Sequence, residues 1–345
     1  MKNSKLLIIL LLVGTINADV VSEEYDEHEV ITITKDFYRK NFIIYNAKHD
    51  VVNILVPTNS LNFDENDDEE KKENFDKYLI LFFVEADVDT AGNIVDKGLY
   101  VYKNGQATKL LENGRDAAAS SDNSTDVFFG AKDGIYMYDN KENKAVKYGS
   151  VTDDIIAIAK ENATDVIYYL NKDHELYKVT DNGKKSVKIN DVVGAQEIVL
   201  DRANNLYFYT EDKQVYVLNE NGVKKFTELP EHPKSVKLIK PPVLEEGVVL
   251  LTFNAFYVLY PNGKCKLAQF VITSNAKPSA YAMEGTVVQY FAYHKKIYKY
   301  NLLEILAGDV FEDLNKLLEE NQGIILNASP VNKISTCKIK KYKQI

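Results

Sequence analysis

Short apolar runs and polar turns alternate along the chain, and one arrangement of them recurs with a period near forty residues. An apolar residue followed by tyrosine marks the same place in each repeat, and successive tyrosines are 36, 41, 39, 41 and 41 residues apart. An apolar run precedes each pair and a polar turn separates the two, which is the pattern of a β-hairpin. The six pairs are Leu99-Tyr100, Ile135-Tyr136, Leu176-Tyr177, Val215-Tyr216, Phe256-Tyr257 and Ile297-Tyr298.

Each repeat continues in the same way after the tyrosine. A second turn follows most pairs, as at residues 181–183, 219–222 and 261–263, and the Asn-Gly steps in these turns are strong hairpin signals. A more polar strand comes next, and an apolar run leads into the following unit. Four strands in about forty residues are the signature of a β-propeller blade. We therefore predict an all-β fold, a six-bladed β-propeller formed by residues 19–301.

The ring of blades has to close, because each sheet buries its faces only against its neighbours. Closure commonly pairs strands from the two ends of the chain. Residues 51–56 are expected to form the outer strand of the last blade, since residues 297–301 are followed by helix-like sequence rather than a fourth strand. Residues 41–46 resemble the tyrosine-bearing strands, so seven blades are the alternative to six.

Two segments interrupt or follow the repeats. Residues 62–76 are a highly charged insertion that we interpret as a solvated acidic loop, because it lacks the glycine and the alternating ligands of a calcium loop. Residues 302–345 are predicted to form a helix and a strand-like tail packed on the propeller. The helix, over residues 302–321, has its apolar residues on a single face. A helix that binds a partner protein is the alternative.

The first 18 residues have the three regions of a secretory signal peptide, namely a basic start, an apolar run and a small residue at the cleavage site. The competing interpretation is a membrane anchor, but the apolar stretch from Leu6 to Ile16 is much shorter than the ~20 residues that span a bilayer. We therefore expect a secreted, extracellular protein with no membrane partner.

Secretion changes the chemistry expected of the cysteines and of several asparagines. Cys265 and Cys337 are the two cysteines of the chain, and an oxidising compartment allows them to form a disulfide. Two unpaired thiols are the alternative. Asn123, Asn162 and Asn327 lie in glycosylation sequons, the last of them weakened by a following proline.

Composition and motif content narrow the range of functions. Acidic residues outnumber basic residues by 51 to 42. This excess argues against a nucleic-acid partner, because a surface that binds nucleic acid has to be basic. No nucleophile elbow, phosphate-binding loop or zinc-binding His-Glu-x-x-His motif is present in the sequence. The five histidines fall at turns or near the N-terminus. We therefore assign no catalytic residue, no metal ligand and no cofactor.

Several segments of the repeats carry a resemblance to a known family. They are Phe129-Gly130-Ala131-Lys132-Asp133-Gly134-Ile135-Tyr136, Asn204-Asn205-Leu206-Tyr207-Phe208, Val215-Tyr216-Val217-Leu218 and Val52-Asn53-Ile54-Leu55. In these segments, and over roughly residues 50–300, the chain resembles the insect ommochrome-binding proteins. The resemblance implies a six-bladed propeller of the regucalcin and gluconolactonase group, and a haemolymph carrier of a small aromatic pigment. The acidic insertion and the longer tail depart from that family.

The same resemblance places a ligand site at the mouth of the central channel. The lactonase relatives hold a divalent metal there, at positions that correspond to Asp154 and Gln196 and to the surroundings of Lys234 and Lys277. Because the last two are cations, a ligand with a carboxylate is expected in place of a metal. Surface charges are the alternative role for both lysines.

Three tyrosines are candidates for the aromatic walls of this site, where a planar ring could stack on them. They are Tyr168, Tyr209 and Tyr281. Packing between blades is the alternative role for each. The predicted function is therefore a non-enzymatic carrier of a small aromatic ligand. A metal-dependent lactonase-like hydrolase and a scaffold with a protein partner are the two alternatives.

Overall fold

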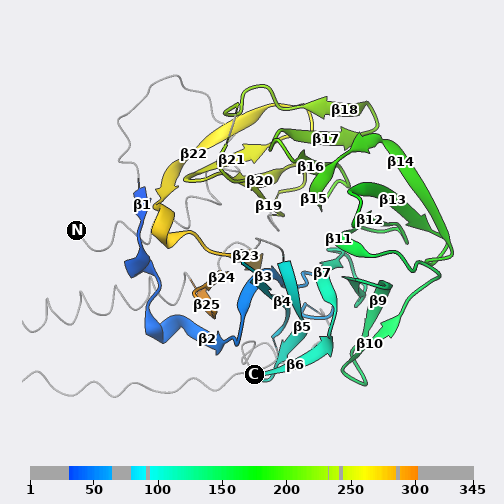
Figure 1. Ribbon diagram of the computed structural model, residues 1–345, viewed down its shortest axis with the longest axis horizontal. Coiled ribbons are helices and arrows are strands. Elements are labelled where there is room, and N and C mark those ends of the chain that lie inside the picture. The colour runs from blue at the N-terminus through cyan, green and yellow to red at the C-terminus, as the bar shows by residue number, and fades with distance from the viewer. Residues whose placement is uncertain are drawn as a thin grey trace, which may run out of the picture. The chain divides into compact units, whose positions relative to one another are not determined.

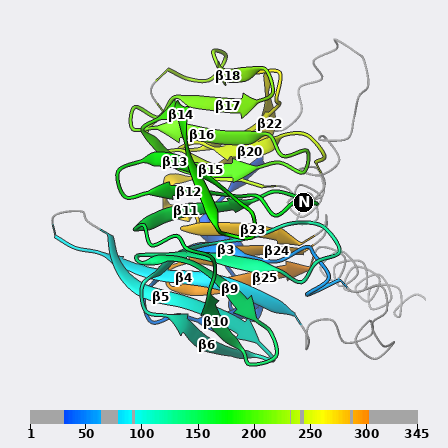
Figure 2. The ribbon, with the colours of Figure 1, turned by 90° about the vertical axis from the view of Figure 1, so that its right-hand side faces the viewer.

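Six β-sheets stand around a central axis in the computed structural model, like the blades of a propeller (Figure 1). The structure describes residues 31–63, 79–90, 94–231, 233–240, 244–284 and 288–301. Seen from the side, the sheets of successive blades stack on one another (Figure 2). The all-β, six-bladed prediction is confirmed, and the seven-bladed alternative is not, because the described residues form six sheets.

The first three blades each consist of four antiparallel strands that follow one another from the channel outward. Blade 1 contains β3 (Asp50–Leu55), β4 (Ile80–Val88), β5 (Ile94–Lys103) and β6 (Gln106–Leu111). Blade 2 contains β7 (Gly114–Ala119), β8 (Val127–Ala131), β9 (Gly134–Asp139) and β10 (Lys144–Lys147). Blade 3 contains β11 (Ile155–Lys160), β12 (Ile167–Asn171), β13 (Glu175–Thr180) and β14 (Lys185–Val193).

The remaining blades keep the order, and the last two also take up a strand from the N-terminal segment. Blade 4 contains β15 (Ala195–Leu200), β16 (Leu206–Thr210), β17 (Val215–Asn219) and β18 (Gly222–Lys225). Blade 5 contains β19 (Lys237–Ile239), β20 (Val248–Leu251), β21 (Ala255–Leu259) and β22 (Cys265–Ile272), with β1 (Ile31–Ile33) beyond it. Blade 6 contains β23 (Ala280–Glu284), β24 (Val288–Tyr293), β25 (Lys296–Asn301) and β2 (Ile43–Asn46).

The polarity of each strand follows its distance from the axis. The second strands are sandwiched between neighbouring blades, and every residue of β8 and β20 is buried. The outermost strands face solvent on one side, and three of the four residues of β10 and of β18 are exposed. Burial of apolar side chains between sheets is the main favourable contribution to folding, so this gradient fixes which strand lies inside.

The recurring tyrosine has a structural reason. Each tyrosine lies on the third strand of its blade, and five of the six lie across from an aromatic residue of the second strand; Tyr257 lies across from Leu250. Tyr100 stacks on Phe83 with ring centroids 5.1 Å apart, and Tyr177 stacks on Tyr169 at the same distance. Cross-strand aromatic pairs of this kind stabilise a sheet by roughly 0.5–1 kcal/mol each.

The N-terminal segment closes the ring, although not with the strand that the sequence predicts. Strand β2 pairs antiparallel with β25 and forms the outer strand of blade 6, whereas residues 51–56 belong to β3, the innermost strand of blade 1. The 3-10 helix η2 (Lys35–Phe37) precedes β2 along the chain and contacts blade 6. Phe37 stacks on Tyr300 with ring centroids 4.4 Å apart, and the Tyr38 hydroxyl donates to the Ala276 carbonyl at 2.8 Å.

Two further 3-10 helices occur in the described residues, η3 (Lys40–Phe42) and η4 (Ser274–Ala276). The expected signal peptide, the helix over 302–321, the tail and most of the acidic insertion lie outside the described residues. The insertion leaves β3 and returns to β4, and its two ends meet where Asn62 exchanges hydrogen bonds of 2.8 and 2.9 Å with the backbone of Ile80. Within the described part of the chain, no helix is long and apolar enough to span a membrane.

Candidate functional site

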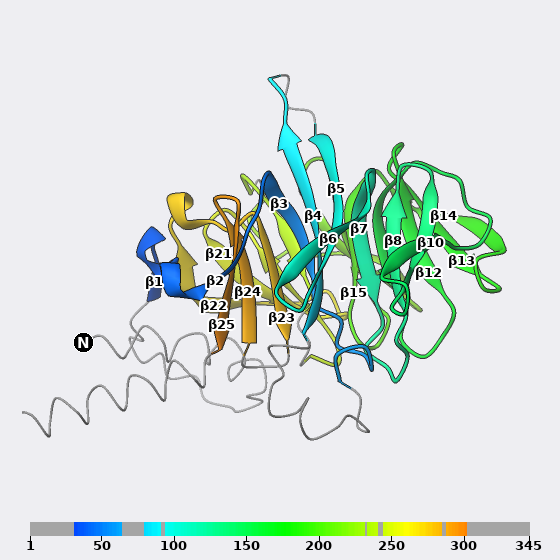
Figure 3. The same ribbon diagram turned by 90° about the horizontal axis from the view of Figure 1, so that it is seen from below.

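A cavity of about 330 Å³ runs along the propeller axis, and the innermost strands of all six blades line it. These strands run in the same direction, so the channel has an upper mouth, where they begin, and a lower mouth, where they end. Strands β4 and β5 extend past the others on the side of the upper mouth (Figure 3). Ile94, at the start of β5, reaches the cavity from this extension and is otherwise exposed to solvent.

One layer of the channel, close to the upper mouth, is polar. Six residues, one on the innermost strand of each blade, occupy equivalent positions. Each pairs with a residue of the second strand, and that residue pairs with the apolar residue that precedes the recurring tyrosine on the third strand. Two of the six are alanines. The other four form what we call the polar layer: Asn53, Asp116, Glu197 and Lys237.

The two carboxylates of the polar layer join neighbouring blades. An innermost strand is an edge strand, so its backbone N–H groups on the channel side have no partner within the sheet. Asp116 accepts the Ile158 amide of the next blade at 2.7 Å, and Glu197 accepts the Leu238 amide of the next blade at 3.0 Å. Asn53 donates its side-chain amide to Asp116, which adds a link from blade 1 to blade 2.

Lys237 completes the polar layer through an ion pair. Its Nζ lies 2.5 Å from Glu197 Oε1, and about a third of the Lys237 side chain is open to water in the channel. Burial opposes the charge of Lys237, but the nearby Glu197 and Asp116 carboxylates outweigh it and raise its pKa. Burial raises the pKa of Asp116 to about 7, against the lowering effect of the Ile158 amide and of Lys237. Near neutral pH this carboxyl is therefore part protonated.

The polar layer does not fit a divalent metal ion. The described residues contain no group of three or more His, Cys, Asp or Glu side chains arranged to hold one. The Lys237 ammonium already lies against Glu197, and a second cation at that carboxylate would be repelled by it. The two carboxylates also accept backbone amides, which leaves fewer oxygen lone pairs for a metal.

Three of the predicted site residues line the cavity: Gln196, Tyr209 and Tyr281. The Tyr281 hydroxyl is buried and finds no hydrogen-bond partner among the described residues, which is costly. Burial raises the pKa of Tyr209 to about 12, so this phenol is neutral and can donate a hydrogen bond into the channel. Both tyrosines border the cavity, and their role as an aromatic wall for a ligand stays a prediction.

The other four predicted residues do not line the cavity. Asp154 forms an ion pair with Arg115, which also binds Asp96 at 2.9 Å. The Asp154 carboxylate therefore takes part in an ion-pair network that links neighbouring blades. Lys277 donates to Ser235 Oγ at 2.5 Å, near the upper mouth. Lys234 is exposed and lies 5.0 Å from the ring of Phe253.

Tyr168 contributes to a different surface. Its hydroxyl donates to Glu161 at 2.9 Å, and its ring borders a groove on the outside of the ring between blades 3 and 4. Whether a tyrosine of the second strand faces the axis or a neighbouring blade depends on its position in the strand pairing. Residue spacing along the sequence does not contain that information.

The sequence analysis missed Asn53, Asp116, Lys237 and Lys240, all of which line the cavity. A signal for three of them exists in hindsight, since a polar side chain interrupts the innermost-strand runs at residues 53, 116 and 237. At residue 197 the run is interrupted in the same way, and there the adjacent Gln196 was predicted as a site residue. Without the alignment of the strands, these interruptions cannot be recognised as one layer.

The predicted modification sites differ in their surroundings. Asn123 is exposed, whereas the Asn162 side chain accepts the Ser121 amide and donates to the Arg202 carbonyl, both at 2.7 Å. Cys265 is half-buried, with its Sγ 3.9 Å from Glu228 Oε2. Cys337 and Asn327 lie outside the described residues, so the disulfide and the third sequon stay predictions.

The comparisons with known proteins bear on the fold. No family profile and no curated protein match the sequence. One similar solved structure is PorZ, an essential surface component of the type-IX secretion system of Porphyromonas gingivalis, at TM-score 0.46 and 11% identity over 74% of this chain and 37% of that chain. Another is the extracellular domain of the hybrid two-component system BT4673 from B. thetaiotaomicron, at TM-score 0.46 and 12% identity, over 74% of this chain and 32% of that chain. The chain thus spans roughly a third of the length of either neighbour.

Proposed function

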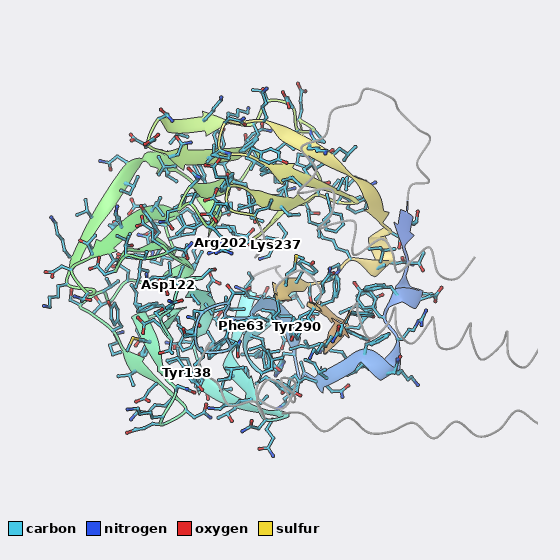
Figure 4. All side chains as sticks on the ribbon, turned by 180° about the vertical axis from the view of Figure 1, so that it is seen from behind. Phe63, Asp122, Tyr138, Arg202, Lys237 and Tyr290 are labelled. Atoms are coloured by element: carbon cyan, nitrogen blue, oxygen red, sulfur yellow. The ribbon has the colours of Figure 1, made fainter. Side chains whose placement is uncertain are left out.

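We propose that this protein is a secreted carrier that binds a small organic molecule in the central channel without converting it. The observation that carries the proposal is the cavity of about 330 Å³ at the axis, lined by apolar side chains and by polar and charged groups. This volume lies within the range of roughly 300–1,000 Å³ that small-molecule sites occupy. Figure 4 places Lys237 and Arg202 beside the central opening of the ring.

The lining favours a ligand with an aromatic body. Tyr209 and Tyr281 present ring surface to the cavity, together with aliphatic residues such as Ile54 and Ile158. Flat ring systems gain from contact with tyrosine faces and edges.

The charged groups of the polar layer favour ligand binding without catalysis. Asp116 and Glu197 accept backbone amides of the next blade, and Lys237 is paired with Glu197, so each of these groups already has a structural role. A hydrolase of the lactonase type would need a metal ion at this place, and the ammonium of Lys237 disfavours it. The resemblance to ommochrome-binding proteins and the signal-like N-terminus support an extracellular pigment carrier.

Native mass spectrometry and an absorption spectrum of the protein from its natural fluid would test the carrier function directly. We expect a bound small molecule that absorbs in the near-ultraviolet or visible range and is released on unfolding. A tightly associated protein with no bound small molecule would favour the scaffold function instead. Enzymatic turnover that is lost on chelation and restored by a divalent metal would contradict the proposal.

Binding of the neutral fluorescent probe N-phenyl-1-naphthylamine would locate the site. Ala117 lies on β7 and lines the cavity, so Ala117→Phe fills part of it and should weaken binding at least about tenfold. Thr108→Phe adds the same ring on the exposed outer strand β6 and serves as the matched control. Equal binding by both variants, with thermal unfolding unchanged, would show that the probe binds outside the channel.

A further inference from the structure

The lower mouth of the channel contains a lysine with no bonded partner. Lys240 directly follows β19, three residues beyond Lys237, and lines the same cavity. Three residues of extended chain span about 10 Å, so the two lysines lie near opposite mouths. In the part of the chain that the structure describes, Lys240 makes no hydrogen bond and no ion pair, whereas Lys237 is paired with Glu197.

Two more cations lie close to Lys240. Lys160, at the end of β11, is mostly buried and donates to the carbonyls of Glu161 and Thr164 at 2.6 and 2.5 Å, which fixes its position. Arg202, beside the central opening in Figure 4, acts on Lys240 through space, as Lys160 does. The lower mouth therefore brings together three positive side chains from blades 3, 4 and 5, and Arg202 is paired with the exposed Glu245 carboxylate, 3.5 Å from its Nε.

The acidic residues near the lower mouth are occupied elsewhere. Asp201 accepts the side chain of Asn205, the Tyr207 hydroxyl and the Gly247 amide at 2.8–3.1 Å. Asp122 accepts the Ser120 hydroxyl and the amides of Ser124 and Ala163 at 2.8–3.1 Å. Both carboxylates lower the local positive potential, but neither contacts Lys240.

Lys240 is thus a cation with no bonded counter-ion among the residues that the structure describes. Burial, with the nearby charges of Arg202 and Lys160, lowers the pKa of Lys240 to about 8 against the opposite effect of Asp201 and Asp122. An anion placed beside the Lys240 ammonium would form a charge-assisted hydrogen bond in a poorly solvated place, where such bonds are strong.

We propose that the lower mouth is an anion-binding subsite, and that the ligand of the channel carries an acidic group (carboxylate, sulfonate or phosphate) that pairs with Lys240. This inference rests on the proposed function, because it assumes that the body of the ligand occupies the cavity between Tyr209, Tyr281 and the lower mouth. It adds the chemical class of the ligand, an aromatic or apolar acid that enters with its charged end toward Lys240.

Two fluorescent probes with the same rings distinguish the affinity that comes from an anionic group from the affinity that comes from the aromatic body. The anionic probe 8-anilinonaphthalene-1-sulfonate differs from N-phenyl-1-naphthylamine by its sulfonate. We expect the wild-type protein to bind the sulfonate at least about tenfold more tightly, since a hydrogen bond to a charged group contributes that much. Lys240→Met should remove this preference and leave the affinity for the neutral probe within about twofold. Lys234→Met, at an exposed lysine near the upper mouth, should keep it.

The outcomes distinguish the two proposals. Equal affinity of the wild-type protein for both probes would overturn the anion subsite and leave the carrier function standing. A sulfonate preference that survives in Lys240→Met but is lost in Lys234→Met would overturn the assignment to the lower mouth. Binding of neither probe to protein of unchanged melting temperature would contradict the carrier function itself, and the subsite with it.

Discussion

The two mouths of the channel each contain a lysine, and the surroundings of the two lysines are opposite in charge. Lys237 and Lys240 are three residues apart at one strand of blade 5 and line one cavity. At the upper mouth, Glu197 neutralises Lys237 and at the same time holds the next blade by its backbone amide. At the lower mouth, Lys240 faces two other cations and has no hydrogen bond or ion pair among the described residues. Charges in a propeller channel can thus stabilise the ring or remain available for a ligand, and their partners decide which.

The comparison predicts that the upper mouth supports stability and the lower mouth supports binding. Glu197→Ala leaves Lys237 without its partner and the Leu238 amide without its acceptor. We expect a loss of about 3 kcal/mol in the free energy of unfolding, the lower end of the range for breaking a buried ion pair, because part of Lys237 is open to water. Denaturant unfolding measures it. Glu197→Gln keeps the acceptor and should lose about half as much, so equal losses would contradict the role of the amide.

The protonation of Asp116 gives the polar layer a pH dependence. Because burial raises the pKa of Asp116 from 3.8 to about 7, the folded protein holds this proton more tightly than the unfolded chain does. The contribution of Asp116 to stability is therefore full below pH 4 and is lost as the pH rises through 7. We expect the stability advantage of the wild type over Asp116→Asn to shrink by about 2 kcal/mol from pH 5.5 to pH 8. Denaturant unfolding measures this difference, and a wild-type advantage in stability that grows with pH would contradict the raised pKa of Asp116.

The lower mouth should show its pH dependence in binding. The pKa of Lys240 is about 8 in the free protein, and a bound anion raises it, so the charge-dependent part of the affinity is complete below that pH. As the pH rises from 7 to 9.5, we expect the affinity for 8-anilinonaphthalene-1-sulfonate to fall about fivefold, with little change for the neutral probe. Fluorescence titration checks both, and a parallel fall for the two probes would point to a change in the protein rather than in Lys240.

The smallest expected effect is the most diagnostic. Lys240→Met replaces a cation without a bonded partner by an apolar side chain of similar length, so we expect the free energy of unfolding to change by less than about 1 kcal/mol, with either sign. Glu197→Ala measured side by side provides the contrast. A large destabilisation by Lys240→Met would mean that the lower mouth, like the upper one, uses its charge to hold the ring together.

The repeat was readable from the sequence because its cause is local. A tyrosine recurs about every forty residues on the third strand of a blade, and in blades 1, 3 and 4 it stacks on a ring of the preceding strand, to which a short turn joins it. The turns are equally local. Gly222 and Gly263 adopt φ values of 91° and 81° in the predicted turns, a conformation that glycine adopts without strain. Six units and their strand order follow from these features.

The closure of the ring could not be read in the same way. Residues 43–46 and 50–55 are both short and partly apolar, and either could pair with the last blade as far as its sequence goes. The choice depends on contacts between the two ends of the chain, such as Phe37 on Tyr300 and Tyr38 with Ala276. Those contacts join residues more than two hundred positions apart.

The site shows the same division. Gln196, Tyr209 and Tyr281 were predicted to contribute to the site, and the structure places them along the cavity. Lys237 and Lys240 were not predicted, although they lie only a few residues from Lys234, which was. Strand β19 covers only Lys237–Ile239, and Lys234 and Lys240 lie outside it, so the alternation of side chains along a strand does not decide which lysine reaches the channel.

The order of apolar and polar positions, by itself, determined that this chain forms four-stranded sheets and that these sheets repeat around an axis. Burial and hairpin formation act over a few residues, and the sequence displays them directly. Only the tertiary structure decided which strand closes the ring, which polar side chains share one layer, and which lysine lacks a bonded partner. Each of these depends on side chains from different blades meeting at the axis, and that meeting exists only once the ring has formed.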